Sequence, residues 1–197
     1  MEARLPPRRL LICAAALALL VVLTSGCGDG TPARAAARTK DPPLARYSSS
    51  FLSFSHPAAW KAYASRPGGL HFNPLVYLSA QPVHEPCSTK GKTTTCGFPV
   101  DRLEPGGVLV SWLYNGPPAI GLGPGRQIQV GGRPARIVET TGGICRRIGA
   151  DRTVDVLVAV QPLPSALVEF TACLRGPGLA QDESDVTALL ASTTFSH

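Results

Sequence analysis

Two neighbouring segments with alternating side chains constrain the fold of this chain more than any other feature. Valine occupies every second position of residues 154–160, and residues 168–173 alternate in the same way between Val168, Phe170 and Ala172 on one side and more polar residues on the other. Alternate side chains of a β-strand point to opposite faces of its sheet. These segments are therefore predicted to be adjacent strands, joined through a turn at 161–164.

Further regions also have the pattern of strands. One strand, ending at 115–118, is indicated by side chains that share a face: Val108, Val110, Trp112 and Tyr114. The pair Gly131-Gly132 predicts a hairpin between 127–130 and 133–140, because both central positions of a type I′ turn need a positive φ. Residues 75–80 are another candidate strand, and the serines near residue 50 lie in a further one.

The last element is predicted to be a helix. Three acidic residues suit its first turn, where the helix dipole favours negative charge: Asp182, Glu183 and Asp185. An apolar face follows with helical spacing: Val186, Leu189 and Leu190. A second helical turn is expected at 57–64. The pattern of the folded region as a whole is mostly strand.

The N-terminal segment has the organisation of an export signal. Arginines at positions 4, 8 and 9 precede an apolar run at 10–23, which is shorter than the about 20 residues that a membrane span needs. The run ends in a segment that resembles the lipobox of bacterial lipoproteins: Leu23-Thr24-Ser25-Gly26-Cys27. A simple cleaved secretory signal, with no role for Cys27, and twin-arginine export through Arg8-Arg9 are the alternatives.

The lipobox resemblance implies a location. Residues 1–26 would be removed as a signal peptide, and Cys27 would carry a diacylglycerol and often an N-acyl chain such as palmitate. Two or more acyl chains give stable anchoring. The protein would then be held on the outer face of the bacterial cell membrane. Residues 27–46, rich in Gly, Ala, Pro and Arg, are expected to form a flexible tether, and 47–197 a single domain of about 150 residues.

The domain resembles a known family at its two ends. The segment 54–60 is similar to the phenylalanine, proline and tryptophan signature of PsbP-like domains, and 186–195 is similar to their final helix with its following aromatic residue. The resemblance implies an α+β fold, in which a central antiparallel sheet is flanked by helices. It also implies a non-catalytic binding or assembly role.

Four cysteines remain after Cys13 is cleaved off and Cys27 is acylated: Cys87, Cys96, Cys145 and Cys173. An even number outside the cytoplasm predicts two disulfides, for which three connectivities are open. We expect Cys87–Cys96, closing a polar loop, and Cys145–Cys173, tying the segment before one strand to the end of the next. Metal binding and redox catalysis are the alternatives, but the sequence has neither a Cys-x-x-Cys motif nor a closely spaced Cys/His pair.

The sequence contains no recognisable catalytic motif. Its histidines are scattered at 56, 71, 84 and 197, without His-Glu-x-x-His, and there is no Gly-x-Ser-x-Gly. His56 is expected to have a packing or capping role, and His84-Glu85 to lie on the surface. We therefore assign no catalytic, cofactor-binding or metal-ligating residue.

Arg146, Arg147 and Arg152 are candidate anion contacts, because guanidinium groups bind phosphate and carboxylate in a bidentate manner. The alternative is that these arginines are solvated, and that Trp112 and Tyr114 belong to the core. The formal charge of +6 falls to +4 once residues 1–26 are removed. So mild an excess, without a basic run, argues against nucleic acid as a partner.

Together these features predict a membrane-anchored, non-catalytic binding or accessory module of the cell envelope. Its partner would be an envelope protein, an anionic lipid or a cell-wall polymer. One alternative is an envelope hydrolase whose site is assembled only in three dimensions. The other is a carrier of a hydrophobic ligand, which predicts a closed apolar cavity between sheet and helix.

Overall fold

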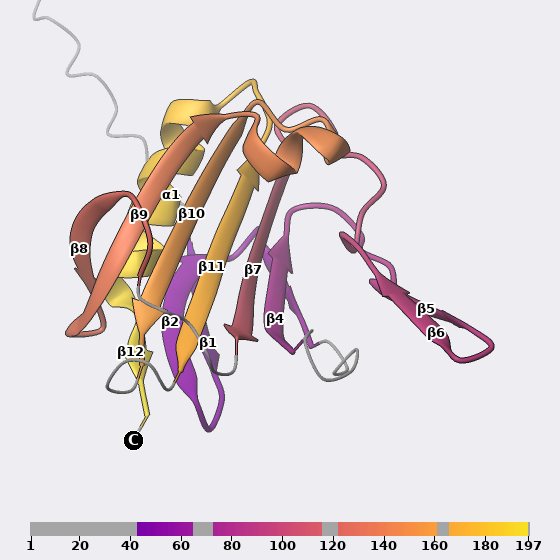
Figure 1. Ribbon diagram of the computed structural model, residues 1–197. Helices are drawn as coiled ribbons and strands as arrows, with labels where there is room; N and C mark the ends of the chain where they lie inside the picture. Colours follow the sequence, from indigo (N-terminus) through magenta and orange to yellow (C-terminus); the bar gives the residue numbers. More distant parts are fainter. Residues whose placement is uncertain (1–42, 65–72, 116–121, 161–165, 197) are drawn as a thin grey trace, which may run out of the picture. The chain divides into compact units, whose positions relative to one another are not determined.

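A seven-stranded antiparallel sheet forms the centre of the folded unit (Figure 1). Its strands, in spatial order, are β3 (Lys61–Tyr63), β4 (Pro74–Ser79), β7 (Val108–Asn115), β11 (Leu167–Leu174), β10 (Arg152–Ala159), β9 (Arg133–Thr141) and β8 (Arg126–Val130). The computed structural model describes residues 43–64, 73–115, 122–160 and 166–196, all within the compact unit 40–197. The expected signal peptide, Cys27, the tether up to residue 42, His71, His197 and the turn at 161–164 lie outside these ranges.

The strand predictions are confirmed. β10 and β11 pair in antiparallel register, with Val156 opposite Phe170. β8 and β9 form the expected hairpin, in which Gly131 and Gly132 have φ values of 57° and 73°. The pattern of alternation therefore identified the central strands and the faces that they bury.

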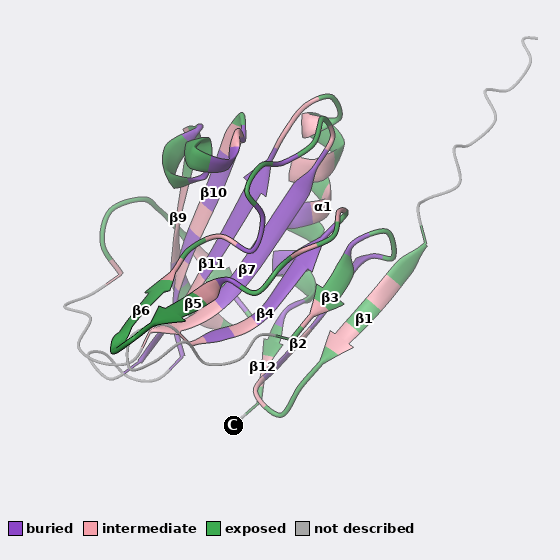
Figure 2. Ribbon diagram, turned by 90° about the vertical axis from the view of Figure 1, so that its right-hand side faces the viewer, coloured by how far each residue is buried: buried purple, intermediate pink, exposed green. Residues whose placement is uncertain are grey.

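A second layer covers one face of this sheet, which we call the helix face. It consists of α1 (Leu179–Ser192) and a three-stranded sheet in the order β1 (Leu44–Ser48), β2 (Leu52–Pro57) and β12 (Thr194–Phe195). The core between the layers is rich in aromatic rings, and Trp112 lies 6.2 Å from Phe54 and 4.8 Å from Phe170 between ring centroids. Figure 2 shows that buried residues follow the central strands.

The expected α+β fold, with helices flanking the sheet, is wrong. The described chain is mostly β-structure, with one α-helix, α1, and one short 3₁₀ helix, η1 (Gly143–Ile148). The segment 57–64, expected to be helical, contains the end of β2, a turn and β3. The reason is that the second layer is itself partly a sheet: β2 alternates with period two and buries Leu52 and Phe54.

The start of the folded unit also differs from the prediction. Strand β1 begins at Leu44, so 44–46 belong to a sheet and not to the tether. Their sequence has little hydrophobic alternation, and β1 is held by its pairing with β2, in which Ala45 is opposite His56. This pairing depends on a partner strand, so the composition of the segment alone did not indicate it.

The opposite face of the central sheet, which we call the open face, is only partly covered. A small apolar cluster that includes Leu103, Leu109 and Ile148 lies beneath η1 and the loop before β7. The hairpin of β5 (Cys87–Lys90) and β6 (Thr93–Cys96) projects beside this face and is largely exposed (Figures 1 and 2).

Candidate functional site

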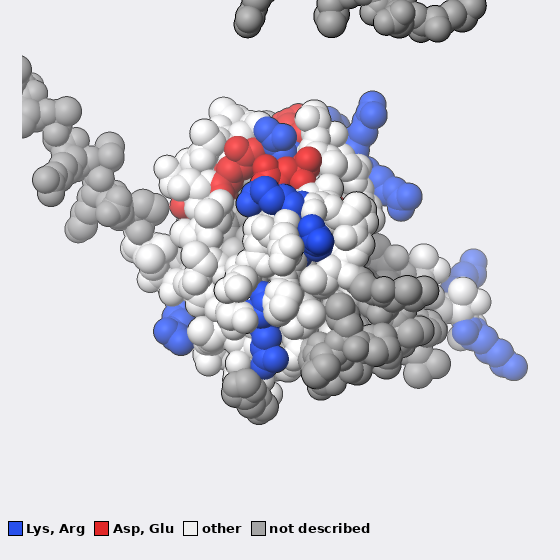
Figure 3. Space-filling model, turned by 60° about the vertical axis from the view of Figure 1, so that its left-hand side comes forward, with Lys and Arg blue, Asp and Glu red and all other residues white. Residues whose placement is uncertain are grey.

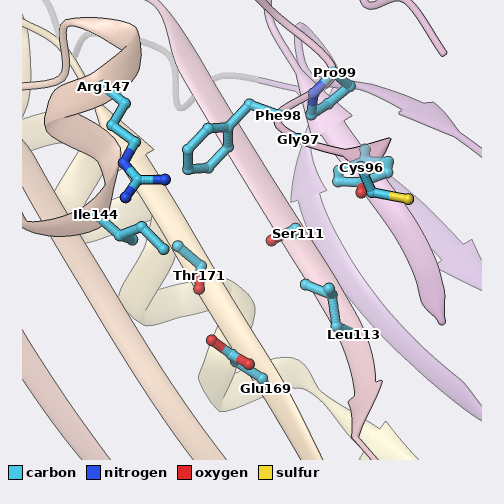
Figure 4. Close-up of a pocket in the computed structure, with 11 residues that line it drawn as sticks. Cys96, Gly97, Phe98, Pro99, Ser111, Leu113, Ile144, Arg147, Glu169 and Thr171 are labelled. Carbon is cyan, nitrogen blue, oxygen red and sulfur yellow. The ribbon is translucent and has the colours of Figure 1, made fainter. Parts of the chain in front are cut away.

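A groove of about 240 Å³ lies on the open face, between η1 and the segment that follows β6 (Figure 4). Its floor is formed by β4, β7 and β11, and its walls by η1 and residues 96–99. We call it the open-face groove. The residues that line it are Tyr77, Cys96, Gly97, Phe98, Pro99, Ser111, Leu113, Ile144, Arg147, Glu169 and Thr171.

Strand register places a row of polar side chains across the floor. Thr171 lies opposite Ser111, which lies opposite Tyr77. On the other side, Asp155 pairs with Thr171, whose hydroxyl donates to the Asp155 carboxylate at 2.9 Å. The row thus brings together residues far apart in sequence.

Burial raises the pKa of the two titratable groups in this row. For Tyr77, the charge of Glu85 adds to the upward shift of the pKa. Burial also raises the pKa of Asp155. The hydrogen bond from Thr171 opposes that shift, and the charge of Glu169 reinforces it.

Two disulfides hold the walls of the groove, and they join the cysteine pairs expected from the sequence. Cys145–Cys173 connects η1 to β11, with a Cα–Cα distance of 5.4 Å and both residues buried. Cys87–Cys96 joins directly opposed residues of the β5–β6 hairpin, 4.0 Å apart between Cα atoms. The expected polar loop is therefore an exposed hairpin, and Cys96 at its end reaches the groove.

The arginine cluster expected from the sequence is divided between two faces. Arg147 lines the groove, where Figure 4 shows it extending from η1 toward Phe98. Arg146 is exposed and does not line the groove. Arg152 lies on the helix face, where its Nε donates to the Glu183 carboxylate at 2.7 Å. The three arginines therefore do not form one site, and anion binding by any of them stays a prediction.

The reason for this division is strand geometry. Arg152 is paired with Leu174 at the start of β10, so it shares the face of the buried valines, and the groove lies on the other side of the sheet. Figure 3 shows acidic side chains gathered in one patch on the side of α1 and β9, with basic side chains beside them. Arg152–Glu183 and Arg126–Glu139 are the ion pairs of this region.

Neither described histidine lines the groove, although the main-chain N–H of His84 donates to the carbonyl oxygen of Pro99 in its wall at 2.8 Å. His56 is buried, its Nδ1 lies 2.9 Å from the carbonyl oxygen of Pro57, and its ring packs edge-on against Phe54, which agrees with the expected packing role. His84 is exposed as expected, with its Nε2 3.4 Å from the carboxylate of Asp101. Neither imidazole has a hydrogen bond to a described serine.

A second hollow lies between α1 and the edge of the helix face. It measures about 320 Å³ and is lined by charged and polar as well as apolar residues, among them Glu139, Glu183, Thr187 and Val186. It is open to solvent, unlike the closed apolar cavity that a carrier of hydrophobic ligands requires. Within the described ranges no group of three potential metal ligands occurs, and no helix has the length and hydropathy of a membrane span.

Sequence reasoning missed most of the groove. Phe98, Glu169 and Tyr77 carry no motif, but β7 and β11 were predicted together with the face that each buries. The side chains between the buried ones, such as Ser111 and Thr171, had to point to the other face. That alternation was a usable signal, whereas the position of Phe98 depends on the path of a loop.

Comparison of the chain with protein-family models, with curated proteins and with solved structures found no match. The function proposed below therefore rests on the residues of the chain itself.

Proposed function

We propose that this chain is a bacterial envelope lipoprotein whose folded unit is a non-catalytic binding module. The module would be anchored to the outer face of the membrane through lipid on Cys27, and its ligand would occupy the open-face groove. The observation that carries the proposal is the composition of this groove: an open site that combines apolar walls, hydroxyl groups on its floor and one cationic side chain. Such combinations of apolar surface with a few polar groups are typical of ligand sites.

Hydrolysis is less well supported than binding. A serine nucleophile needs a base within hydrogen-bond reach, and both described histidines lie outside the groove. We expect an active-site-directed fluorophosphonate to leave Ser111 unlabelled in the folded protein. Labelling of Ser111 that is lost on heat denaturation would contradict the non-catalytic assignment.

The anchor is tested by the mass of the membrane-extracted protein. We expect a chain that begins at Cys27 and carries acyl mass, and that gains two hydrogens for each of its two disulfides on reduction. Cys27→Ser should abolish the added mass and release the protein from the membrane fraction. Cys13→Ser is the matched control, because that cysteine lies in the part to be removed, and it should leave the mature mass unchanged. A soluble product cut at another position would overturn the proposed anchor.

A further inference from the structure

Two opposite charges line the open-face groove without neutralising each other. Arg147 reaches it from η1 and Glu169 from β11. In the described part of the chain neither side chain takes part in an ion pair, and the Glu169 carboxylate accepts a hydrogen bond from the Asn115 amide at 2.7 Å. A site that keeps a separate cation and anion is electrostatically complementary to a ligand that carries both charges.

The size of the groove limits this ligand. At about 30 Å³ for each water molecule, its volume of about 240 Å³ corresponds to roughly eight waters. That space suits a compound of about the size of a dipeptide. Because the groove is open to solvent, a longer ligand would extend beyond it.

The walls of the groove add an apolar requirement. Phe98 and Leu113 line it, and Ile144 at its rim is 54% exposed, which is unusual among the large apolar residues of the described chain. Covering this surface with an apolar group would stabilise the complex. On the floor, Thr171 lies between the two charged residues and Ser111 lies beside it on β7, and a hydroxyl group can bond an amide (Figure 4).

We propose that the open-face groove binds a short peptide with a free ammonium group and a free carboxylate. The carboxylate lies against Arg147, the ammonium group against Glu169, and an apolar side chain against Phe98 and Ile144. This inference rests on the proposed binding function and names its ligand class. Charge complementarity selects a zwitterion over a purely anionic compound, because Glu169 would repel a second negative group.

The test measures binding of L-leucyl-L-alanine to the mature folded unit by calorimetry and by amide chemical shifts. The dipeptide amide, which lacks the carboxylate, and the N-acetyl dipeptide, which lacks the ammonium group, serve as probes on the unmodified protein. We expect each to bind about tenfold or more weakly, since a hydrogen bond to a charged group is involved. Arg147→Gln should remove the discrimination against the amide, and Glu169→Gln the discrimination against the acetylated form.

Arg146→Gln is the matched control. It removes the same charge from the neighbouring position of η1, outside the groove, and should leave both discriminations intact. Retention of the wild-type amide spectrum would verify that each variant is folded. D-alanyl-D-alanine, tested in parallel, distinguishes the source of the ligand: preference for it assigns a cell-wall peptide, and preference for the L-dipeptide a protein-derived one.

Three results would overturn the inference. The first is no binding of either dipeptide at about 10 mM, a concentration about tenfold above the Kd of a weak complex. The second is equal affinity for the free and the blocked dipeptides. The third is an equal loss of discrimination in the Arg146 and Arg147 variants. Each is separable from the proposed anchor, because acylation of Cys27 is measured by mass and not by binding.

Discussion

Gly143 lies where the chain leaves β9 and enters η1, at φ +50°. A Cβ atom there would overlap the Thr140 hydroxyl oxygen and would lie 2.9 Å from that of Thr153. The Thr153 hydroxyl donates to the carbonyl of Gly142, so it is already fixed in place. Only glycine fits this position, which places η1 and with it Arg147.

We therefore expect Gly143→Ala to destabilise the protein strongly. The left-handed backbone costs an alanine about 1–2 kcal/mol, and overpacking adds about 1–3 kcal/mol. Gly132→Ala is the control, since Gly132 has φ +73° but open space around its Cβ position, and it should show only the backbone cost. Urea unfolding of both variants measures the difference. Equal losses of stability would show that the packing around Gly143 can adjust.

At the scale of elements, the docking of α1 places a carboxyl group in an unusual environment. Asp182 lies in the first turn, where the helix dipole favours its charge, yet its pKa is raised to about 6. Burial is the larger cause and the charge of Asp185 the second, and Asp182 Oδ2 is a buried atom without a hydrogen-bond partner among the described residues. The cost of desolvating the charged Asp182 carboxylate therefore outweighs its favourable interaction with the helix dipole.

This shift predicts a dependence of stability on pH. The folded protein holds the proton more tightly than the unfolded chain, so the contribution of Asp182 is fully present below pH 3.8 and is lost as the pH rises through about 6. Asp182→Asn should raise Tm at pH 7 and have little effect at pH 4.

The difference between the Tm curves of wild type and variant isolates this group from the other titrating residues. Asp185→Asn removes only the second cause, so it should lower the pKa of Asp182 by less than a full return to 3.8. Titration of the Asp182 carboxyl by NMR gives that value directly. Titration near its ordinary pKa in the wild type would contradict the effect of burial.

At the scale of the whole molecule, the two disulfides restrain the chain unequally. Cys145–Cys173 closes a loop with a sequence separation of 28, and Cys87–Cys96 one of 9. Loop-closure entropy alone gives about 3.5 kcal/mol for the first and about 2.5 kcal/mol for the second. The first also holds η1 against the central sheet, whereas the second lies in an exposed hairpin.

We expect replacement of both Cys145 and Cys173 by alanine to lower the free energy of unfolding more than the same change at Cys87 and Cys96. It should also weaken ligand binding in the groove, because η1 carries Arg147. Denaturant unfolding of the two double variants compares them directly, each serving as the control for the other. A larger loss of stability for the Cys87/Cys96 variant would contradict this order of the two disulfides.

Alternation also explains how much of the fold was predictable. Period-two patterns identified β7, β10 and β11, and helical spacing identified α1, because these elements bury one face against a core. The residue pattern indicated mostly strand, and this was right. The α+β expectation came instead from short similarities at 54–60 and 186–195, and those segments do not determine whether helices or a second sheet cover the core.

The sequence by itself indicated which side chains of the central strands face the core beneath α1, because alternation is a local property of the chain. It also indicated the pairing of the four cysteines, since one pair closes a short polar loop and the other ties two adjacent predicted strands. Only the tertiary structure decided that Arg147 faces Glu169 across a groove while Arg152 lies on the opposite face. Such a site is made by strand order, register and the path of a loop, and these depend on pairings between distant residues, such as Ser111 with Tyr77 and with Thr171.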